Sequence, residues 1–440
     1  MYVPDVQIKT ALDISKSRKY LFRNLLMSNL NFGSDKKTQN PRHYWHSFPA
    51  KFPPDLPRLF IENLTSPGQV VLDPMAGSCT TLIEASMMNR LSYGFDIDPL
   101  SFIIGKAKLH NYDLSEVKTE GYKILTLGQF DFEFKREELT NDLNSRFDKE
   151  TLLFLDYWWL KETQIELLSL IRQIEKVTDE KIRDFLKLVF SSIIITKSGG
   201  VTRSRDLAHT RPHRVENKLP NSAFTEFGKK LIRILDNGYR NLPTKSILRI
   251  GNAKSLPLND RSVDLIVTSP PYANNAIDYM RAHKFSLVWF GNHIDNLKNT
   301  RKQYIGAETF IKTGKTELPE YSQKIVRTLS ELNPNKGKAL HRYYCEMYDV
   351  IKEMHRVLKP QSACIIVVAT SILNGLDVNT HQCLAEIGQS VGFDLVHIGE
   401  RAIHRDSRML PTSHLKNGSQ IEARMHNEFI IGLWKESDQW

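Results

Sequence analysis

Residues 70–97 read VVLDPMAGSCTTLIEASMMNRLSYGFDI and contain the stretch that decides the fold. A short apolar run ends at Asp73, Gly77 stands in the turn that follows, and a second apolar run closes the stretch. This pattern predicts a strand over Val70–Leu72, a helix over Thr80–Asn89 and a strand over Ser92–Ile97. A strand, a glycine-bearing turn, a helix and a further strand in this order are typical of a parallel α/β sheet.

The same alternation resumes later in the chain. Apolar runs and helical periodicity predict strands over 246–250, 263–267, 363–369, 395–398 and 428–434, and helices over 343–358 and 380–391. We therefore predict an α/β fold built on one doubly wound, mostly parallel, Rossmann-like sheet.

Two long segments interrupt this alternation. From Ile182 to Ile193 the apolar residues recur with the spacing of one helical face, which predicts that the first segment is mainly helical. The second segment is polar and rich in Gly and Lys. The predicted organisation is a lead-in (1–45), a catalytic core (46–110, 246–291 and 341–440), a helical insert (111–245) and a second polar insert (292–340).

Composition and motifs exclude several classes of protein. Of the 440 residues 41% are hydrophobic, yet no run approaches the roughly 18 apolar residues of a membrane-spanning helix. The N-terminus lacks a signal pattern, so we expect a cytoplasmic protein with no membrane partner. The four Cys residues show no paired spacing, which predicts reduced thiols and no zinc ribbon. We predict no metal site and expect His43 and His46 to lie on the surface.

Two predicted strands end in acidic residues, at Asp73 and at Asp96. Open parallel sheets bind ligands at the carboxyl ends of their strands. The Asp73 carboxylate can bind the ammonium group of a ligand. Gly77 lets the backbone come close to a ligand carboxylate at the N-terminus of the following helix. Asp96 can accept both hydroxyls of a ribose. An amino acid joined to a nucleoside fits both positions, and this describes S-adenosylmethionine. The alternative is that both acids form helix-capping turns in another nucleotide-binding sheet.

A third strand end carries Ser269-Pro270-Pro271-Tyr272. The two prolines fix the backbone and remove two N–H donors, so that the carbonyl groups of Ser269 and Pro270 remain available as acceptors. Tyr272 offers a flat stacking surface. Acceptors beside an aromatic ring suit the exocyclic amino group of a nucleic-acid base, which in duplex DNA must first be flipped out of the helix. The alternative is a rigid loop of structural importance only.

Three strings carry a resemblance to a known family: Val71–Thr81 (VLDPMAGSCTT), Tyr93–Pro99 (YGFDIDP) and Val267–His283 (VTSPPYANNAIDYMRAH). They resemble the S-adenosylmethionine-dependent amino-methylating DNA methyltransferases, in particular the N4-cytosine branch with Thr-Ser-Pro-Pro-Tyr. Enzymes that methylate adenine N6 usually carry Asp or Asn at the place of Ser269. The segment His46–Pro54 resembles the element that packs on the methionine end of the cofactor in this family.

The resemblance implies a methyltransferase sheet and a function. The chain is expected to transfer a methyl group from S-adenosylmethionine to the N4 amine of a flipped cytosine in double-stranded DNA. A cognate restriction endonuclease is a candidate partner. The implied catalytic residues are Ser269, Pro270, Pro271 and Tyr272. The implied cofactor-binding residues are Lys51, Phe52, Asp73, Met75, Gly77, Ser78, Thr81, Asp96, Ile97, Asn252 and Ala253.

The sequence departs from the family pattern at three of its positions. The family commonly has Phe at Met75, Gly at Cys79 and Asp at Asn252. Met75 can still cover an adenine, and Asn252 can hydrogen-bond its amino group through the side-chain oxygen. Cys79 is small enough to replace glycine if its φ is negative.

A basic stretch follows the predicted helix at 182–193. Residues 197–218 (KSGGVTRSRDLAHTRPHRVENK) hold six Lys and Arg residues against two acids. A flexible basic segment suits contacts with DNA phosphates, and we expect DNA to be bound by Arg203, Arg205, His209, Arg211 and Arg214. The alternative is a solvated basic loop. The pair Trp158-Trp159 is expected in the core of the insert, and a less concentrated basic set lies between Lys298 and Lys324.

Three other functions stay open at this stage. The nearest is methylation of adenine N6, and a second is methylation of RNA by the same machinery. A third, of another class, is a nucleic-acid-binding subunit that retains the cofactor fold with little turnover. Carbon-5 methylation of cytosine is discarded, because it needs a Cys nucleophile, usually in Pro-Cys, and the chain contains no Pro-Cys. The recognition sequence and the oligomeric state are not predicted.

Overall fold

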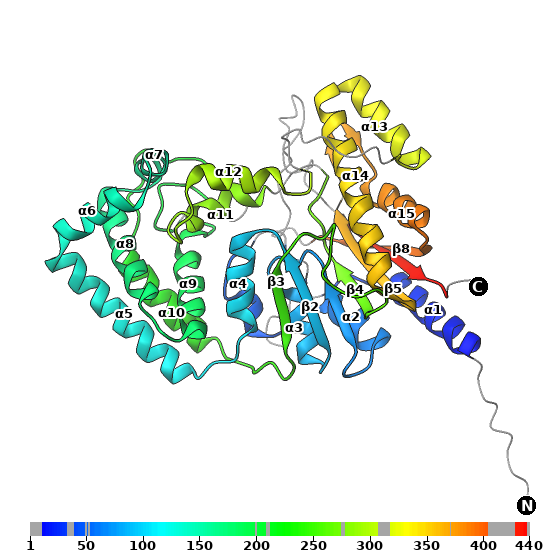
Figure 1. The fold of residues 1–440 in the computed structure, drawn as a ribbon, viewed down its shortest axis with the longest axis horizontal. Helices are drawn as coiled ribbons and strands as arrows, with labels where there is room; N and C mark the ends of the chain where they lie inside the picture. Colours follow the sequence, from blue (N-terminus) through cyan, green and yellow to red (C-terminus); the bar gives the residue numbers. More distant parts are fainter. Residues whose placement is uncertain are drawn as a thin grey trace, which may run out of the picture.

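The computed structural model describes residues 11–32, 39–48, 51, 53–198, 200–207, 212–273, 278–306, 317–369, 371–403 and 427–437. Its central sheet has seven strands (Figure 1). They are β1 (Val70–Asp73), β2 (Leu91–Asp96), β3 (Ser246–Ile250), β4 (Val263–Thr268), β5 (Leu358–Ala369), β8 (Asp394–Ala402) and β9 (Asn427–Lys435). A separate small hairpin joins β6 (Ile372–Leu373) to β7 (Leu376–Asp377).

The strands follow the order β3-β2-β1-β4-β5-β9-β8. The first five run parallel, and β9 lies antiparallel between β5 and β8. The order reverses between β1 and β4, which is the place where open sheets form a ligand crevice. The predicted doubly wound, mostly parallel methyltransferase sheet is therefore confirmed.

One strand begins earlier than the sequence predicts. We expected the fifth strand to begin at Ala363, after Lys359-Pro360. The structure instead starts β5 at Leu358, which pairs with Val263 on β4 before regular pairing resumes at Ala363. Gln361 in between has a φ of 57°, so that a local irregularity accommodates the proline.

Apolar side chains alternate between the two faces of the sheet, because successive residues of a strand point to opposite sides. Val71 and Leu265 belong to the core under α1 and α2, whereas Leu72 and Ile266 belong to the core under α14 and α15. The sheet is covered by α1 (Ala11–Met27), α2 (Asp55–Leu64), α3 (Thr80–Met87), α14 (Pro334–Val357) and α15 (Thr380–Val391), and α13 (Glu320–Leu332) packs on α14.

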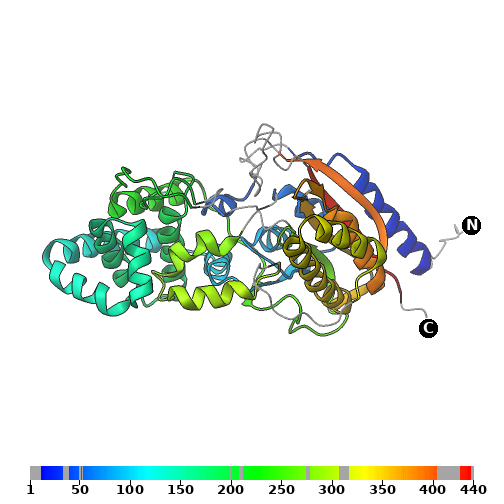
Figure 2. The ribbon, with the colours of Figure 1, turned by 90° about the horizontal axis from the view of Figure 1, so that it is seen from above.

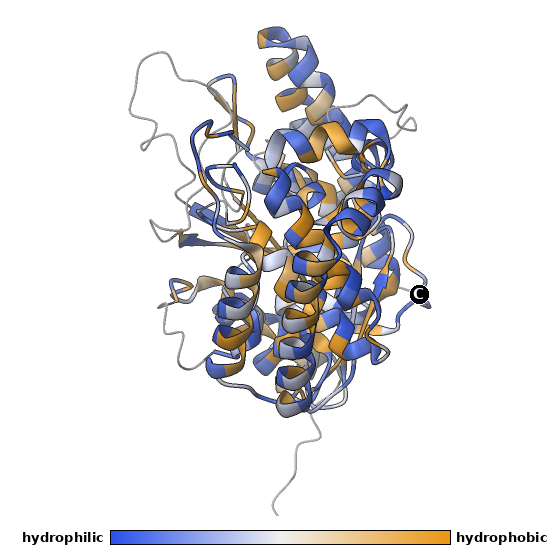
Figure 3. Cartoon of the chain, turned by 90° about the vertical axis from the view of Figure 1, so that its left-hand side faces the viewer, coloured by the Kyte–Doolittle hydropathy of each residue, from blue (hydrophilic) through white to orange (hydrophobic). Residues whose placement is uncertain are grey.

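A large helical layer stands beside the sheet (Figures 1 and 2). It comprises α4 (Pro99–Leu109), α5 (Leu114–Phe134), α6 (Arg136–Arg146), α7 (Lys149–Trp158), α8 (Lys161–Glu175), α9 (Glu180–Ile194), α10 (Ala223–Asp236), α11 (Tyr279–Leu287) and α12 (Ile294–Lys302). These helices share one apolar core, and Figure 3 shows hydrophobic and hydrophilic residues alternating along them. The first interruption of the α/β pattern is thus mainly helical, as predicted.

Two further expectations about the core are confirmed. Trp159 is buried in the helical core and Trp158 packs against it. All four cysteines are free thiols and buried. No helix within the described ranges is long and apolar enough to cross a bilayer.

Candidate active site

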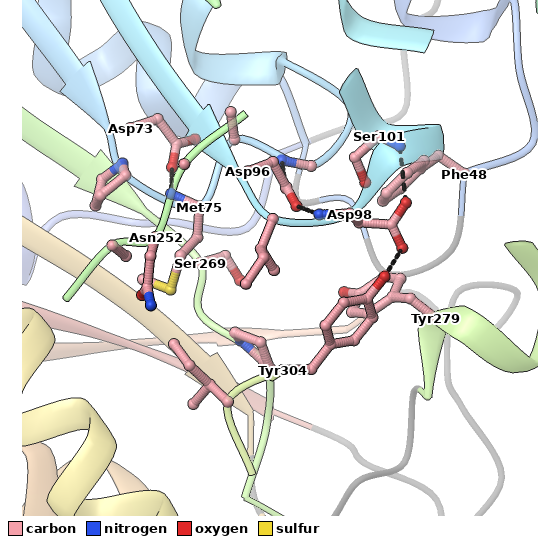
Figure 4. Close-up of a pocket in the computed structure, with 18 of the residues that line it drawn as sticks. Phe48, Asp73, Met75, Asp96, Asp98, Ser101, Asn252, Ser269, Tyr279 and Tyr304 are labelled. Atoms are coloured by element: carbon pink, nitrogen blue, oxygen red, sulfur yellow. Dashed lines mark hydrogen bonds between the residues drawn. The ribbon is translucent and has the colours of Figure 1, made fainter. Parts of the chain in front are cut away.

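A cavity lies at the carboxyl ends of the parallel strands, at the point where the strand order reverses (Figure 4). From the strand ends it is lined by Asp73, Asp96 and Ser269, and by Asn252 from the loop after β3. On the other side, Tyr279 lines it from the start of α11 and Tyr304 from the segment after α12. The candidate cofactor residues and the start of the Ser-Pro-Pro-Tyr loop therefore border one continuous space.

Asp73 is tied to the neighbouring strand and to its own turn. Its Oδ1 accepts hydrogen bonds from the Thr268 hydroxyl at 2.7 Å and from the Met75 N–H at 3.2 Å. Burial raises the pKa of this carboxyl group to about 6, although these hydrogen bonds favour the ionised form. A cation placed beside Asp73 would stabilise the charge that burial disfavours.

Asp96 is held by two backbone donors. Its Oδ2 accepts the Gly77 N–H at 2.8 Å and its Oδ1 accepts the Asp98 N–H at 2.9 Å. Burial, together with the nearby charge of Asp98, raises the pKa of Asp96 to about 7. Each oxygen keeps acceptor capacity for a ligand hydroxyl. Gly77 has a φ of 48°, a conformation that favours glycine, so the turn that reaches Asp96 depends on this residue type.

Four more of the predicted cofactor residues line the cavity. Met75, Ile97 and Ala253 supply apolar atoms, and Asn252 supplies an amide. The Asn252 Oδ1 accepts the Lys254 N–H at 3.0 Å, which fixes the orientation of the side chain. Apolar surfaces with one oriented amide suit a flat heterocycle with a polar edge.

The backbone at Cys79 differs from the expectation. Its φ is 64°, in the left-handed region, so the condition of a negative φ is not met. The common glycine of the family would fit this conformation without steric cost, whereas a side chain there costs about 1–2 kcal/mol. The thiol is buried against Gly105 of α4, where an added Cβ would approach the Cys79 Sγ to 2.5 Å.

The Ser-Pro-Pro-Tyr loop begins directly after β4. Ser269 and Pro271 line the cavity. Pro270 is buried, and Tyr272 is also buried and is not among the lining residues. The Tyr272 hydroxyl donates to Glu428 of β9 at 3.1 Å, so this contact fixes the orientation of its ring.

The expectation that His43 and His46 are surface residues is wrong. Both are buried. His43 Nε2 lies 2.7 Å from Glu84 Oε1 on α3, and His46 Nε2 lies 2.9 Å from Ser191 Oγ on α9. Burial lowers the pKa of both rings. These two contacts join residues 43–46 to α3 and α9. No local sequence pattern indicates either contact.

The remaining predicted cofactor residues differ in position. Lys51 lines the cavity and its ammonium group contacts the His43 carbonyl, whereas Phe52 lies outside the described residues. Ser78 and Thr81 are buried and do not line the cavity. The Thr81 hydroxyl instead donates to the Val267 carbonyl at 3.2 Å and joins α3 to β4.

Sequence reasoning missed a buried carboxylate that joins three segments. Asp98 Oδ1 accepts the N–H groups of Leu100 and Ser101 at the start of α4. Asp98 Oδ2 lies 2.8 Å from His283 Nδ1 on α11 and accepts the Tyr304 hydroxyl at 2.7 Å. Although burial raises its pKa, these partners lower the pKa of Asp98 overall. The Asp-Pro dipeptide signals the helix cap, but no local pattern links Asp98 to residues so far along the chain.

The predicted DNA-binding arginines adopt different environments. Arg203 donates to the Glu216 carbonyl at 2.6 Å, and Arg214 lies over the Tyr157 ring at 4.5 Å. Arg205 is exposed. His209 and Arg211 lie outside the described residues.

Comparisons with known proteins give consistent matches. Residues 6–102 match the N6/N4 family model, which is described as DNA methylase. The type II methyltransferase M.MvaI of Kocuria varians is 25% identical over 90% of this chain and 91% of its own length. M.BsoBI of Geobacillus stearothermophilus, also a type II methyltransferase, is 23% identical over 81% of this chain and 79% of its own length.

Among solved structures, a SAM-dependent methyltransferase of Methanosarcina mazei aligns with a TM-score of 0.32 at 8% identity, covering 86% of this chain and 98% of that chain. The fold is established by the strand order described above and not by this alignment. The matches do not distinguish N6 from N4 methylation. Over residues 6–102 the chain is therefore similar to the N6/N4 DNA methylases, and over most of its length it is similar to type II methyltransferases.

Proposed function

We propose that the chain methylates the N4 amine of a flipped cytosine in double-stranded DNA, as the modification enzyme of a restriction-modification system. One observation carries the proposal: a single cavity is bordered by the acids at the ends of β1 and β2 and by Ser269 at the end of β4. The names of the nearly full-length relatives support the type II assignment, with a cognate restriction endonuclease as the expected partner.

The residues that line the cavity fit S-adenosylmethionine. The Asp96 carboxylate accepts the ribose hydroxyls, Met75 and Ile97 cover the adenine, and Asn252 binds its amino group. Asp73 and Lys51 border the cavity with groups of opposite charge, which suit the ammonium and the carboxylate of a methionine moiety. The bound cofactor supplies a methyl group activated by the sulfonium.

The Ser-Pro-Pro-Tyr loop orients the base. The Ser269 hydroxyl and the Pro270 carbonyl accept hydrogen bonds from the exocyclic amine and direct its lone pair into the cavity. The hydrogen bond from Thr268, the last residue of β4, to Asp73 ties the start of this loop to the neighbouring strand β1. In this proposal the Tyr272 ring stacks on the base, and its hydrogen bond to Glu428 holds the ring.

The choice of cytosine N4 rests on Ser269. Loops that act on adenine usually carry an acid or an amide there, so adenine N6 is the nearest alternative product. A weakly active DNA-binding subunit is the candidate from another class. The strained backbone at Cys79, beside the cofactor turn, is the observation that favours it.

The deciding experiment incubates the protein with labelled S-adenosylmethionine and a mixture of DNA and RNA, followed by mass spectrometry of the nucleosides. We expect N4-methylcytosine from DNA. N6-methyladenine would keep the cavity assignment and overturn the choice of base, and methylated RNA would overturn the choice of nucleic acid. Cofactor binding without transfer to any substrate would select the weakly active subunit.

A further inference from the structure

Two arginines from different helices meet at the cavity. Arg281 on α11 and Arg301 on α12 both line it. The Arg281 Nε lies 3.0 Å from Asp278 Oδ2, and the Arg301 Nη2 lies 2.5 Å from the same oxygen. The Asp278 side chain is only 9% exposed, whereas those of Arg281 and Arg301 are 24% and 42% exposed. One buried carboxylate therefore contacts two guanidinium groups that also line the cavity.

A third cation lies near this pair. Lys284 stands one turn further along α11, with its Nζ 5.0 Å from the centre of the Phe154 ring. Burial lowers the pKa of Lys284, and the charges of Arg301, Lys298 and Arg281 lower it further, against the opposing effect of Asp278. Lys298 itself is paired with Glu150 and Asp295. Lys284 thus adds a cation beside two guanidinium groups, and guanidinium groups suit an anion with several oxygens.

The pair borders the same cavity as Ser269. Figure 4 places Tyr279 and Tyr304 on one side, Asp73 and Met75 on the other, and Ser269 between them. Arg281 is two residues beyond Tyr279 on α11, Arg301 is the penultimate residue of α12, and both line the cavity together with Ser269. An anion bound by the pair therefore lies in the space that Ser269 borders.

We propose that Arg281 and Arg301 form a binding site for a phosphate group of the DNA strand that carries the target base. This inference rests on the proposed function. A base that is flipped into a cavity leaves its own flanking phosphates at the mouth of that cavity. Two guanidinium groups held in place by Asp278 match the oxygens of one phosphate, and little side-chain freedom remains to be lost on binding.

The test replaces each arginine separately, as Arg281→Gln and Arg301→Gln. Lys123→Gln is the matched control, because it removes one positive charge from an exposed position on α5 that does not line the cavity. Fluorescence anisotropy with random-sequence duplex DNA gives the affinity between about 50 and 200 mM salt. Calorimetry with S-adenosylmethionine gives the cofactor affinity and checks that each variant is folded.

Each arginine variant should bind DNA roughly tenfold more weakly, because one charge-assisted contact is lost. Its salt dependence should flatten by about 0.9 units of slope for the lost phosphate contact. The control variant and the cofactor affinity should stay unchanged. Because Arg301 is the more exposed of the two, its variant tests the site even if Arg281→Gln does not fold.

Two results would overturn the inference while leaving the proposed function intact, provided that the parent protein methylates DNA. Unchanged DNA affinity and slope in both variants would limit the arginines to tethering α12 to α11. A loss of cofactor affinity with unchanged DNA affinity would assign the anion as the carboxylate of the cofactor. A parent protein that transfers no methyl group to DNA would instead refute the proposed function itself.

Discussion

The two walls of the cavity are built in different ways. The strand-end wall consists of Asp73, Asp96, Asn252 and Ser269. The helical wall consists of Tyr279, Arg281, Arg301 and Tyr304. Side chains of the first wall are fixed mainly by backbone N–H groups two residues further along the chain. In the second wall, Tyr304 and Arg301 are fixed by carboxylates that other segments supply.

This difference separates the expected roles of the walls. Local turns at strand ends place their side chains with little dependence on the rest of the chain, which suits cofactor groups and the reacting amine. The helical wall depends on α11, α12 and the segment after it being docked together through Asp98 and Asp278. Substitutions in the strand-end wall should therefore affect cofactor binding and methyl transfer directly. Substitutions in the helical wall should act by changing the position of that wall.

The largest effect is expected for Asp96→Ala in the strand-end wall. The substitution removes the acceptor for two ribose hydroxyls, each contact contributing roughly 1.5–3 kcal/mol when it is charge-assisted. It also releases the Gly77 N–H that Asp96 holds. Calorimetry should show a loss of cofactor affinity of about 10²-fold or more. If a folded variant bound the cofactor as tightly as the parent, Asp96 would not contact the ribose.

The next effect is expected for Ser269→Ala. The smaller side chain keeps the loop and loses only the hydroxyl, so cofactor and DNA affinity should stay near those of the parent. The methyl-transfer step should slow by about 10²-fold, because the amine loses a positioned partner in the transition state. Single-turnover kinetics with saturating DNA separates the two effects. A parent-like rate would move the reaction away from this loop.

The contrast between the walls also explains what the sequence could predict. Asp73, Asp96 and Ser269 each end an apolar run, so local pattern alone places them at one edge of the sheet. The helical character of 111–245 follows from apolar periodicity in the same way. These features depend on neighbours within a few residues.

Long-range pairings left no such pattern. Tyr304 reaches Asp98 across 206 residues, and His283 reaches it across 185. The burial of His43 depends on Glu84 from another helix, and the φ of Cys79 depends on how the turn meets α4. Each is decided by tertiary packing, which overrides local preference. A buried His with a carboxylate partner looks the same in sequence as a surface His.

Cofactor binding should depend on pH through the strand-end wall. Burial raises the pKa of Asp96 to about 7 in the folded protein, so this carboxyl group is largely protonated below neutral pH. The ionised form is the better acceptor for hydroxyl groups, and cofactor affinity should therefore rise as pH rises through 7. At pH 6 the affinity should be roughly tenfold lower than its plateau, since a proton competes with binding.

Calorimetry between about pH 5.5 and 8.5 measures this dependence. Asp73, whose pKa burial raises to about 6, adds a further loss at the acid end of the range. Affinity that does not change with pH would mean that the bound cofactor does not require the ionised Asp96. The Arg301→Gln variant, altered in the helical wall, should reproduce the profile of the parent.

The smallest effect is expected for Tyr304→Phe in the helical wall. The substitution removes one hydrogen bond to Asp98, which keeps His283 and the two N–H donors of α4. The free energy of unfolding should therefore fall by about the 1.5–3 kcal/mol of one hydrogen bond to a charged group. If Tyr304 positions the wall over the cofactor, calorimetry should show the affinity for S-adenosylmethionine lowered about fivefold, with a nearly unchanged rate of methyl transfer at saturating cofactor.

The control Tyr122→Phe removes a hydroxyl from a partly exposed position on α5 and should change neither quantity. A variant with a lower melting temperature and parent-like cofactor affinity would show that this bond holds only the segment after α12, so that the cofactor contacts come from the strand-end wall alone.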